Sequence, residues 1–114
     1  MINRKDNMPV DIKVNMRGGA GEAVLTALSP ELPAKMRLFS TITLKPGCGI
    51  GYHVHEKDSE LFYILKGTAT YDDNGTKTTL TAGDLALTPA GTGHSIKNEG
   101  AEDVELIALI VFAG

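Results

Sequence analysis

The chain has 114 residues, of which 42% are hydrophobic and 22% charged, and its formal net charge at pH 7 is -3. This length is typical of one domain with a real core, and the composition argues against a wholly disordered or fibrous protein. The charged residues are spread along the chain without blocks, which argues against nucleic acid or an anionic membrane surface as a partner. A small ligand fits this composition better.

The cysteine content and the apolar runs indicate where in the cell the protein is expected. Cys48 is the only cysteine, so no internal disulfide can form, and a cytoplasmic location is favoured. Residues 1–14 are polar and charged where a secretory signal would be apolar. The longest apolar stretch, residues 106–113, is shorter than the roughly 20 residues that span a bilayer. We therefore expect a cytoplasmic protein without a membrane segment.

Two short β-rich runs occupy the first third of the chain. Residues 10–14 alternate apolar and polar side chains, and residues 22–28 form a second run that ends before two prolines. Both are predicted to be short N-terminal edge strands, although residues 22–28 are also compatible with a short helix. We assign residues 1–33 to an N-terminal segment that packs on the rest of the domain or is exchanged across a dimer.

Residues 34–114 read as a series of strands separated by turns. The run 34–44 places apolar side chains on one face at period two and ends at a Pro-Gly turn, and Asn74-Gly75 lies between two threonine-rich runs as in a β-hairpin. Further strands are predicted at 85–88, 93–100 and 103–113, separated by Gly- and Pro-containing turns. Eight or more short strands without a long helix indicate an all-β sandwich or barrel in a single domain.

Two of the predicted strands are apolar at successive positions. These are residues 61–65 and 106–111, and both faces of such a strand are expected to be covered. One face can line the barrel interior. We expect a second subunit to cover the other face, in a homodimer whose interface can also recruit the strand at 10–14.

A pair of histidines stands at the start of the first of these apolar runs. His53 and His55 are two residues apart, so on an extended strand they share a face at a spacing of about 6.6 Å. Glu60 is an odd number of residues further on, and it can face them only if the charged segment 56–59 reverses the chain. Taken alone, a His-x-His pair more often lies on a surface or in a satisfied core than on a metal ion.

The third histidine and several glycines complete a longer pattern. Gly47, His53, His55, Glu60 and Gly67 fit the first motif of the cupins: glycine, five residues, His-x-His, four residues, glutamate, six residues and glycine. A second cupin motif is glycine, five residues, Pro-x-Gly, two residues, histidine, three residues and asparagine. It is matched without gaps by Gly83, Pro89, Gly91, His94 and Asn98. The chain therefore resembles a small microbial cupin, closely over residues 47–98 and in strand pattern over most of the rest.

The resemblance implies a fold and a metal site. The fold would be a double-stranded β-helix, or jelly-roll barrel, with a small-molecule ligand inside it. The metal ligands would be His53, His55, Glu60 and His94, and Asn98 would be a turn or hydrogen-bonding residue. Three imidazoles and one carboxylate suit one divalent ion with two open positions, and Mn, Fe, Ni, Co and Zn are all compatible with this set.

A catalytic acid or base is not evident near this site. The candidates by sequence position are Tyr52, Glu56, Asp58, Tyr63, Arg37 and Cys48. Glu56 and Asp58 are most simply part of a solvated turn, Tyr63 is expected on the outer interface, and Cys48 is expected to be a buried or turn-packed thiol. Arg37 alternates against the apolar face of its strand, so it either lies on the surface or, if its face turns inward, reaches a substrate carboxylate.

Two functions remain open. The first is a small metal-dependent enzyme acting on a compact carboxylate or sugar-derived metabolite, similar to the oxalate-degrading, isomerase or dioxygenase branches of the cupins. The second is a non-catalytic sensor or binding module that holds its ligand through the same ion. The intact ligand set favours the first over the second, and a barrel stabilised by packing alone would not need that set. An inward-facing acid or base would support the enzyme, and an apolar surround would support binding.

Overall fold

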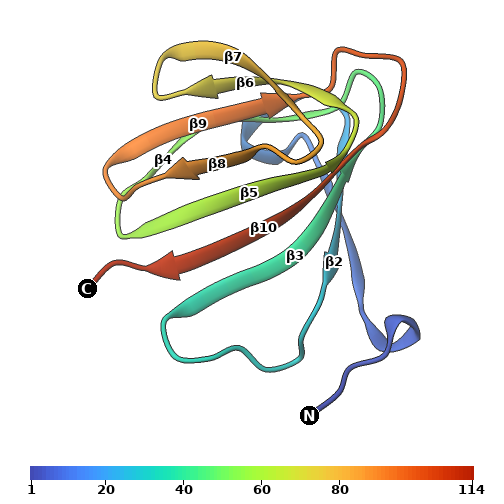
Figure 1. The fold of residues 1–114 in the computed structure, drawn as a ribbon, viewed down its shortest axis with the longest axis vertical. Helices are drawn as coiled ribbons and strands as arrows, with labels where there is room; N and C mark the ends of the chain where they lie inside the picture. Colours follow the sequence, from blue (N-terminus) through green and yellow to red (C-terminus); the bar gives the residue numbers. More distant parts are fainter.

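A computed structural model describes residues 1–114, which form two antiparallel sheets packed face to face (Figure 1). The six-stranded sheet has the order β1 (Val10–Val14), β2 (Glu22–Ala27), β3 (Met36–Leu44), β10 (Val104–Phe112), β5 (Asp58–Lys66) and β8 (Leu85–Thr88). The four-stranded sheet has the order β4 (Gly49–His55), β9 (Thr92–Lys97), β6 (Thr68–Asp73) and β7 (Thr76–Thr81). The predicted all-β barrel is confirmed, and the run at 22–28 is a strand.

The helical content is confined to two single turns, η1 (Lys5–Asn7) and η2 (Met16–Gly18). Neither turn is long or apolar enough to cross a membrane. The η2 turn joins β1 to β2 and lies against β4, where the backbone N–H of Gly49 donates to the carbonyl of Ala20 at 2.9 Å. This contact places the N-terminal segment beside the strand that carries two of the histidines.

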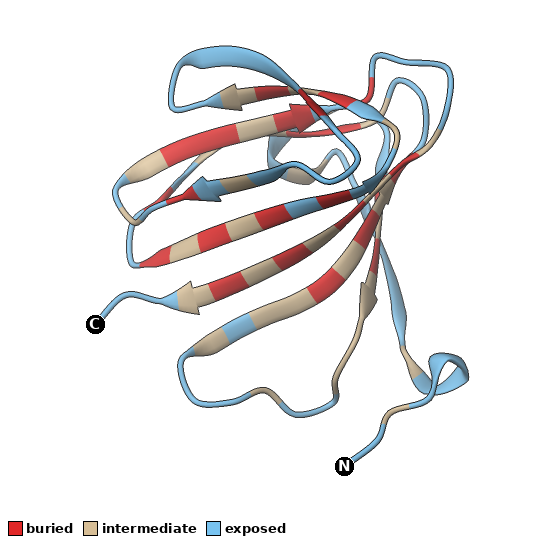
Figure 2. Cartoon of the chain, viewed as in Figure 1, coloured by how far each residue is buried: buried red, intermediate tan, exposed pale blue.

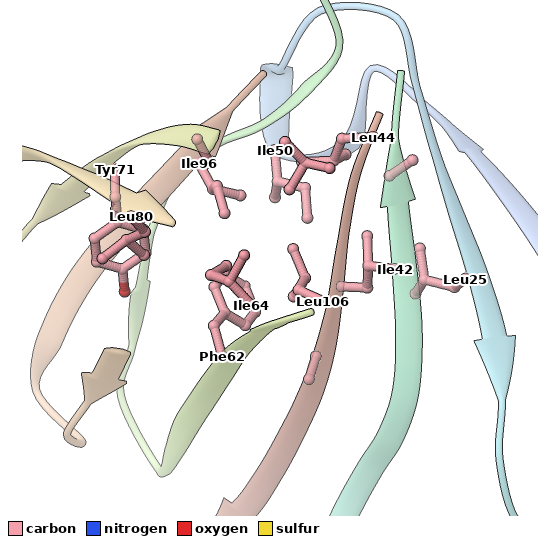
Figure 3. Close-up of a cluster of buried hydrophobic side chains, with 14 residues drawn as sticks. Leu25, Ile42, Leu44, Ile50, Phe62, Ile64, Tyr71, Leu80, Ile96 and Leu106 are labelled. Carbon is pink, nitrogen blue, oxygen red and sulfur yellow. The ribbon is translucent and has the colours of Figure 1, made fainter. Parts of the chain in front are cut away.

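The hydrophobic core lies between the two sheets. Side chains along β3, β5 and β10 alternate between buried and more exposed positions, as the banding in Figure 2 shows. Figure 3 shows the inward side chains of both sheets meeting, among them Ile42, Ile64, Ile96 and Leu106. Period-two burial on each strand therefore leaves a second, outward face on the six-stranded sheet.

The Asn74-Gly75 hairpin forms as predicted. Both residues have positive φ, 49° and 99°, which is the requirement of a type I′ turn between antiparallel strands. The side chain of Asp72 accepts a hydrogen bond from the N–H of Gly75 at 2.7 Å and fixes the turn.

Asn98 is the polar residue that holds the end of β9. Its side chain is fully buried, and its amide nitrogen donates to the carbonyls of Leu44 and Glu102 at 2.8 and 2.6 Å. Its side-chain oxygen accepts from the N–H of Gly100 at 3.0 Å. Asn98 is thus a hydrogen-bonding turn residue, as the sequence predicts.

Candidate metal centre

Three strands bring the four predicted ligand residues together. His53 and His55 project from the same face of β4, and His94 lies directly opposite His53 in the pairing of β4 with β9. Glu60 comes from β5 in the other sheet, after the chain reverses at residues 56–57. The donor atoms of all four residues lie within 4.8 Å of one another, so this cluster could hold a metal ion.

The spacing of the donor atoms is informative about coordination. His55 Nε2 and His53 Nε2 lie 3.1 and 3.2 Å from His94 Nε2. Glu60 Oε1 lies 3.1 Å from His55 Nε2 and 3.0 Å from His94 Nε2. Adjacent donors about 2.1 Å from one ion are about 3.0 Å apart in an octahedron and about 3.4 Å apart in a tetrahedron. The observed spacing is closer to the octahedral value.

Hydrogen bonds at Nδ1 fix the tautomer of His53 and His55. The Nδ1 of His53 donates to the Gly51 carbonyl at 2.8 Å, and the Nδ1 of His55 donates to Asp58 Oδ1 at 2.6 Å. A carbonyl and a carboxylate can only accept, so the proton of each neutral ring is on Nδ1. The Nε2 lone pairs therefore face one another across the cluster, an arrangement that a cation would stabilise.

His94 is held by two hydroxyl groups and an aromatic ring. Its Nδ1 lies 2.7 Å from the hydroxyl of Tyr71 and 2.9 Å from that of Thr88, and these two hydroxyls are 2.9 Å apart. The ring of Phe62 stacks on His94 at a centroid distance of 4.9 Å. Burial raises the pKa of Tyr71 to about 12, so its hydroxyl stays protonated. These contacts orient the most deeply buried of the three histidines.

Asp58 links the cluster to Arg37. Its Oδ2 accepts from Arg37 Nε at 2.9 Å while its Oδ1 accepts from His55, and its side chain is largely buried. Burial raises the pKa of Asp58, but the hydrogen bonds from His55 and Arg37 outweigh it and the net pKa is lowered. The expectation of a solvated turn at Asp58 is therefore wrong, because β5 begins at this residue.

A β-bulge decides the direction of Arg37. In the pairing of β3 with β10, Ile110 lies opposite Leu38 and Val111 lies opposite Met36, so Arg37 is the extra residue on its strand. A bulge changes the direction of a side chain relative to strict alternation. Arg37 thereby lines the cavity beside the cluster and contacts Asp58.

A small cavity of about 90 Å³ opens on the cluster. His53, His55 and Glu60 line it together with two arginines, Arg17 and Arg37. The remaining lining side chains are apolar: Met16, Leu25, Leu38, Ile42, Ile50, Phe62 and Ile110. A cavity of this size holds a few water molecules or a compact ligand.

The electrostatic environment favours neutral His53. Burial lowers its pKa, and the nearby charges of His94, His55 and Arg17 lower it further, whereas the hydrogen bond to the Gly51 carbonyl opposes them. A metal ion binds the neutral ring, so the lowered pKa makes His53 available as a ligand near neutral pH.

Comparison with known proteins shows the family of this chain. The family model of the cupin domain (Cupin_2) matches residues 40–112. The chain is a cupin. It is 40% identical over 113 residues to the oxalate-binding protein of Thermotoga maritima, covering 97% of this chain and 93% of that protein.

Solved structures of other proteins share the fold of this cupin. The crystal structure of a predicted oxalate decarboxylase from Thermotoga maritima superposes with a TM-score of 0.91 at 37% identity, covering 99% of this chain and 100% of that one. The cupin domain of Cnp3 from Schizosaccharomyces pombe has a TM-score of 0.74 at 20% identity, covering 92% of this chain and 70% of that one. The latter likeness concerns the fold alone.

The other sequence candidates lie outside the cluster. Tyr52 and Tyr63 are exposed, Glu56 is an exposed turn residue, and Cys48 is half-buried against Gly21. Sequence reasoning missed Asp58, Tyr71 and Thr88 as partners of the histidines. Tyr71 shares the inward face of β6 with Ala69, so its direction could have been read from period two, but its partner could not.

Proposed function

We propose that this cupin binds a compact carboxylate through a divalent metal ion held by His53, His55, Glu60 and His94. The observation that carries the proposal is the small cavity, in which three of these donors, His53, His55 and Glu60, meet two arginines and an otherwise apolar lining. A carboxylate could occupy open metal positions while a guanidinium neutralises its charge. The resemblance to an oxalate-binding protein at 40% identity points to the same ligand class.

The lining favours binding over catalysis. Apart from the proposed metal ligands, it offers arginines and apolar side chains, and an arginine side chain does not give up its proton in proteins. Asp58 is engaged with His55 and Arg37, and Tyr71 lies behind His94. We therefore propose a binding module that uses the ion to hold its ligand. This reverses the preference for an enzyme that the sequence alone suggested.

A metal-dependent enzyme is the second candidate. It is supported by the likeness to a structure described as a predicted oxalate decarboxylase, at 37% identity and over the whole length of both chains. When bound, the ion would act as a Lewis acid toward the carboxylate. The chain's own residues would orient the ligand through the arginines and exclude water through the apolar lining.

One experiment tests both candidates. The protein is stripped with a chelator, reloaded with Mn²⁺, and titrated with oxalate in a calorimeter, with the metal-free protein in parallel. We expect stoichiometric binding of oxalate to the loaded protein and none to the stripped protein. Formation of formate and carbon dioxide in the same samples would establish the enzyme. Equal binding to both forms, or to neither, would refute the metal-dependent site.

Elemental analysis and native mass spectrometry of the freshly purified protein complement this titration. They identify the metal that the protein acquires in the cell and any ligand that remains bound. A retained mass of a compact dicarboxylate would support the proposal, and a retained sugar derivative would redirect it.

We also propose that the partner is a second copy of this chain. On the outer face of the six-stranded sheet, a paired row without any charge crosses all six strands: Val10, Thr26, Thr41, Ile107, Tyr63 and Leu85. Its neighbours Leu87 and Leu65 are 52% and 45% exposed. A continuous uncharged row of this kind is typical of homodimer interfaces and suits a two-fold pairing.

A further inference from the structure

Arg17 has a backbone conformation that an arginine rarely adopts. It lies in the η2 turn with φ 54° and ψ 30°, in the left-handed region, and Gly18 beside it also has a positive φ, 80°. Such a conformation costs free energy for a residue with a β-carbon, and it occurs often at ligand-binding positions. Local folding alone would favour a glycine at this position, so the presence of an arginine points to a role for its side chain.

Two glycines hold this turn against β4. A β-carbon on Gly51 would lie 2.0 Å from the carbonyl oxygen of Arg17, and one on Gly19 would lie 2.3 Å from the carbonyl oxygen of Gly49. The backbones of η2 and β4 are thus in direct contact. This contact keeps Arg17 beside His53, whose ring projects from the same strand.

The two arginines of the cavity differ in their partners. Arg37 forms an ion pair with Asp58 at 2.9 Å, which neutralises its charge. Arg17 lines the same cavity and forms no ion pair or side-chain hydrogen bond. Of the two cavity arginines, only Arg17 therefore carries a positive charge that no carboxylate neutralises. A metal ion at the cluster would be a second source of positive charge.

The charges of the site then set the charge of the ligand. A divalent cation beside the Glu60 carboxylate would leave one positive charge, and Arg17 adds a second one. A monocarboxylate would neutralise only one of them, whereas a dicarboxylate would neutralise both. A guanidinium also binds carboxylate oxygens through two parallel hydrogen bonds.

We propose that Arg17 is the specificity residue of this cupin: it binds the second acidic group of a compact dicarboxylate whose first group is on the metal. This inference rests on the proposed metal-dependent binding of carboxylates and adds the ligand's charge and the residue that selects it. The strained turn is then the structural cost of placing this guanidinium at the cavity.

The test compares oxalate with glycolate, a compact acid with one carboxylate, on the Mn²⁺-loaded protein. Arg17→Gly removes the guanidinium and relieves the backbone strain. We expect its affinity for oxalate to fall by about tenfold or more, its affinity for glycolate to change less than about twofold, and the melting temperature of the metal-free protein to stay equal or rise.

Lys35→Gly is the matched control. Lys35 is exposed, has a φ of 72°, and does not line the cavity, so this change removes the same charge and the same kind of strain elsewhere. It should leave both affinities unchanged. If the glycine variant at position 17 is unstable, Arg17→Gln supplies the affinity comparison with the backbone strain retained.

The outcomes separate this inference from the proposed function. If the unaltered protein binds Mn²⁺ but not oxalate, the proposed function fails. Two results would show that Arg17 has no role in selecting a dicarboxylate when the unaltered protein does bind oxalate. In the first, both Arg17 variants bind oxalate as tightly as the unaltered protein. In the second, their affinity for glycolate falls by the same factor as their affinity for oxalate. A fall in melting temperature of Arg17→Gly would overturn the assignment of strain to this turn.

Discussion

Asp58 accepts a hydrogen bond from Nδ1 of His55 at 2.6 Å, and this contact determines which ring nitrogen faces the donor cluster. The same carboxylate is paired with Arg37, so it is held from both sides. Partners of this kind fix the orientation and basicity of metal-binding histidines. The relationship makes Asp58 a positioning residue for the proposed metal site.

Replacing Asp58 with alanine should weaken metal binding without abolishing it. The four donors would remain, but His55 would lose its fixed tautomer, and we expect a 10- to 100-fold loss of Mn²⁺ affinity, roughly the usual effect of such partners. Competition with a chelator of known affinity measures this change. Asp6→Ala in the exposed η1 turn is the control, and equal affinities for the two variants would contradict the role of Asp58.

The two hydroxyls at His94 should compensate for each other. Tyr71→Phe leaves Thr88 to accept from Nδ1, and Thr88→Val leaves Tyr71 to do so. Only the double variant leaves a buried ring nitrogen without a partner, which costs about 1–3 kcal/mol. We expect the loss of metal affinity in the double variant to exceed the sum of the single losses. Additive losses in a double-mutant cycle would show that the hydroxyls act independently.

Removal of His53 should separate metal binding from folding. His53 is half-buried at the open side of the cluster, whereas His94 is in the core, so His53→Ala leaves the interior packing unchanged. We expect the metal content to fall sharply, while the melting temperature of the chelator-treated protein shifts little. Atomic absorption and thermal unfolding measure the two quantities. Stoichiometric metal in this variant would refute the ligand assignment.

The contact between η2 and β4 should be sensitive to one methyl group. Gly51→Ala places a β-carbon against the backbone of Arg17, and since the clash involves backbone atoms we expect a loss of about 1–3 kcal/mol in unfolding free energy. Gly100→Ala is a suitable control, because its nearest neighbour would be 3.5 Å away. Denaturant unfolding of both variants measures the difference. Equal unfolding free energies for Gly51→Ala and Gly100→Ala would mean that the η2 turn can move away from β4 at little cost.

A charge on the outer face should disrupt the proposed dimer. Leu87→Asp lies beside the uncharged row on this face and exposes no new core, so the monomer should remain folded while association weakens. Val54 has a similar exposure of 51% and lies on the four-stranded sheet, so Val54→Asp controls for the added charge. Sedimentation velocity at micromolar concentration measures both. A monomeric unaltered protein, or a dimer that tolerates Leu87→Asp, would contradict the interface.

Much of the fold could be predicted because its signals are local. The alternation of apolar and polar side chains predicted the strand at 10–14 with its correct bounds. The Asn74-Gly75 pair predicted the β6–β7 hairpin, because both residues readily adopt the positive φ that its turn requires. His94 was expected at the site through the resemblance to the cupin motif, since it lies 39 residues beyond His55. His53, His55 and Glu60 meet there because their spacing follows strand period and one reversal before Glu60. In these places the interactions that decide the structure are close in sequence.

The contacts around the cluster were harder to predict because they depend on register between distant strands. Arg37 turns toward the cavity only because β3 has a bulge opposite β10, and nothing within residues 34–44 indicates this register shift. The ion pair between Arg37 and Asp58 depends in turn on this new direction of Arg37. Likewise, Thr88 meets Tyr71 across the two sheets, a distance of 17 residues along the chain. Arg17 gave no sequence signal, because its positive φ is a property of the folded turn.

The four donors are divided unequally between the layers of the barrel, with three on the four-stranded sheet and Glu60 alone on the six-stranded sheet. No strand pairing joins these layers. An ion bound to all four residues would therefore act as a cross-link between the two sheets, in addition to the short turn at residues 56–57 that connects β4 to β5. Local separation of the two sheets at this site would then be opposed by the bound ion, and we expect amide hydrogen exchange along β5 to slow when the ion binds.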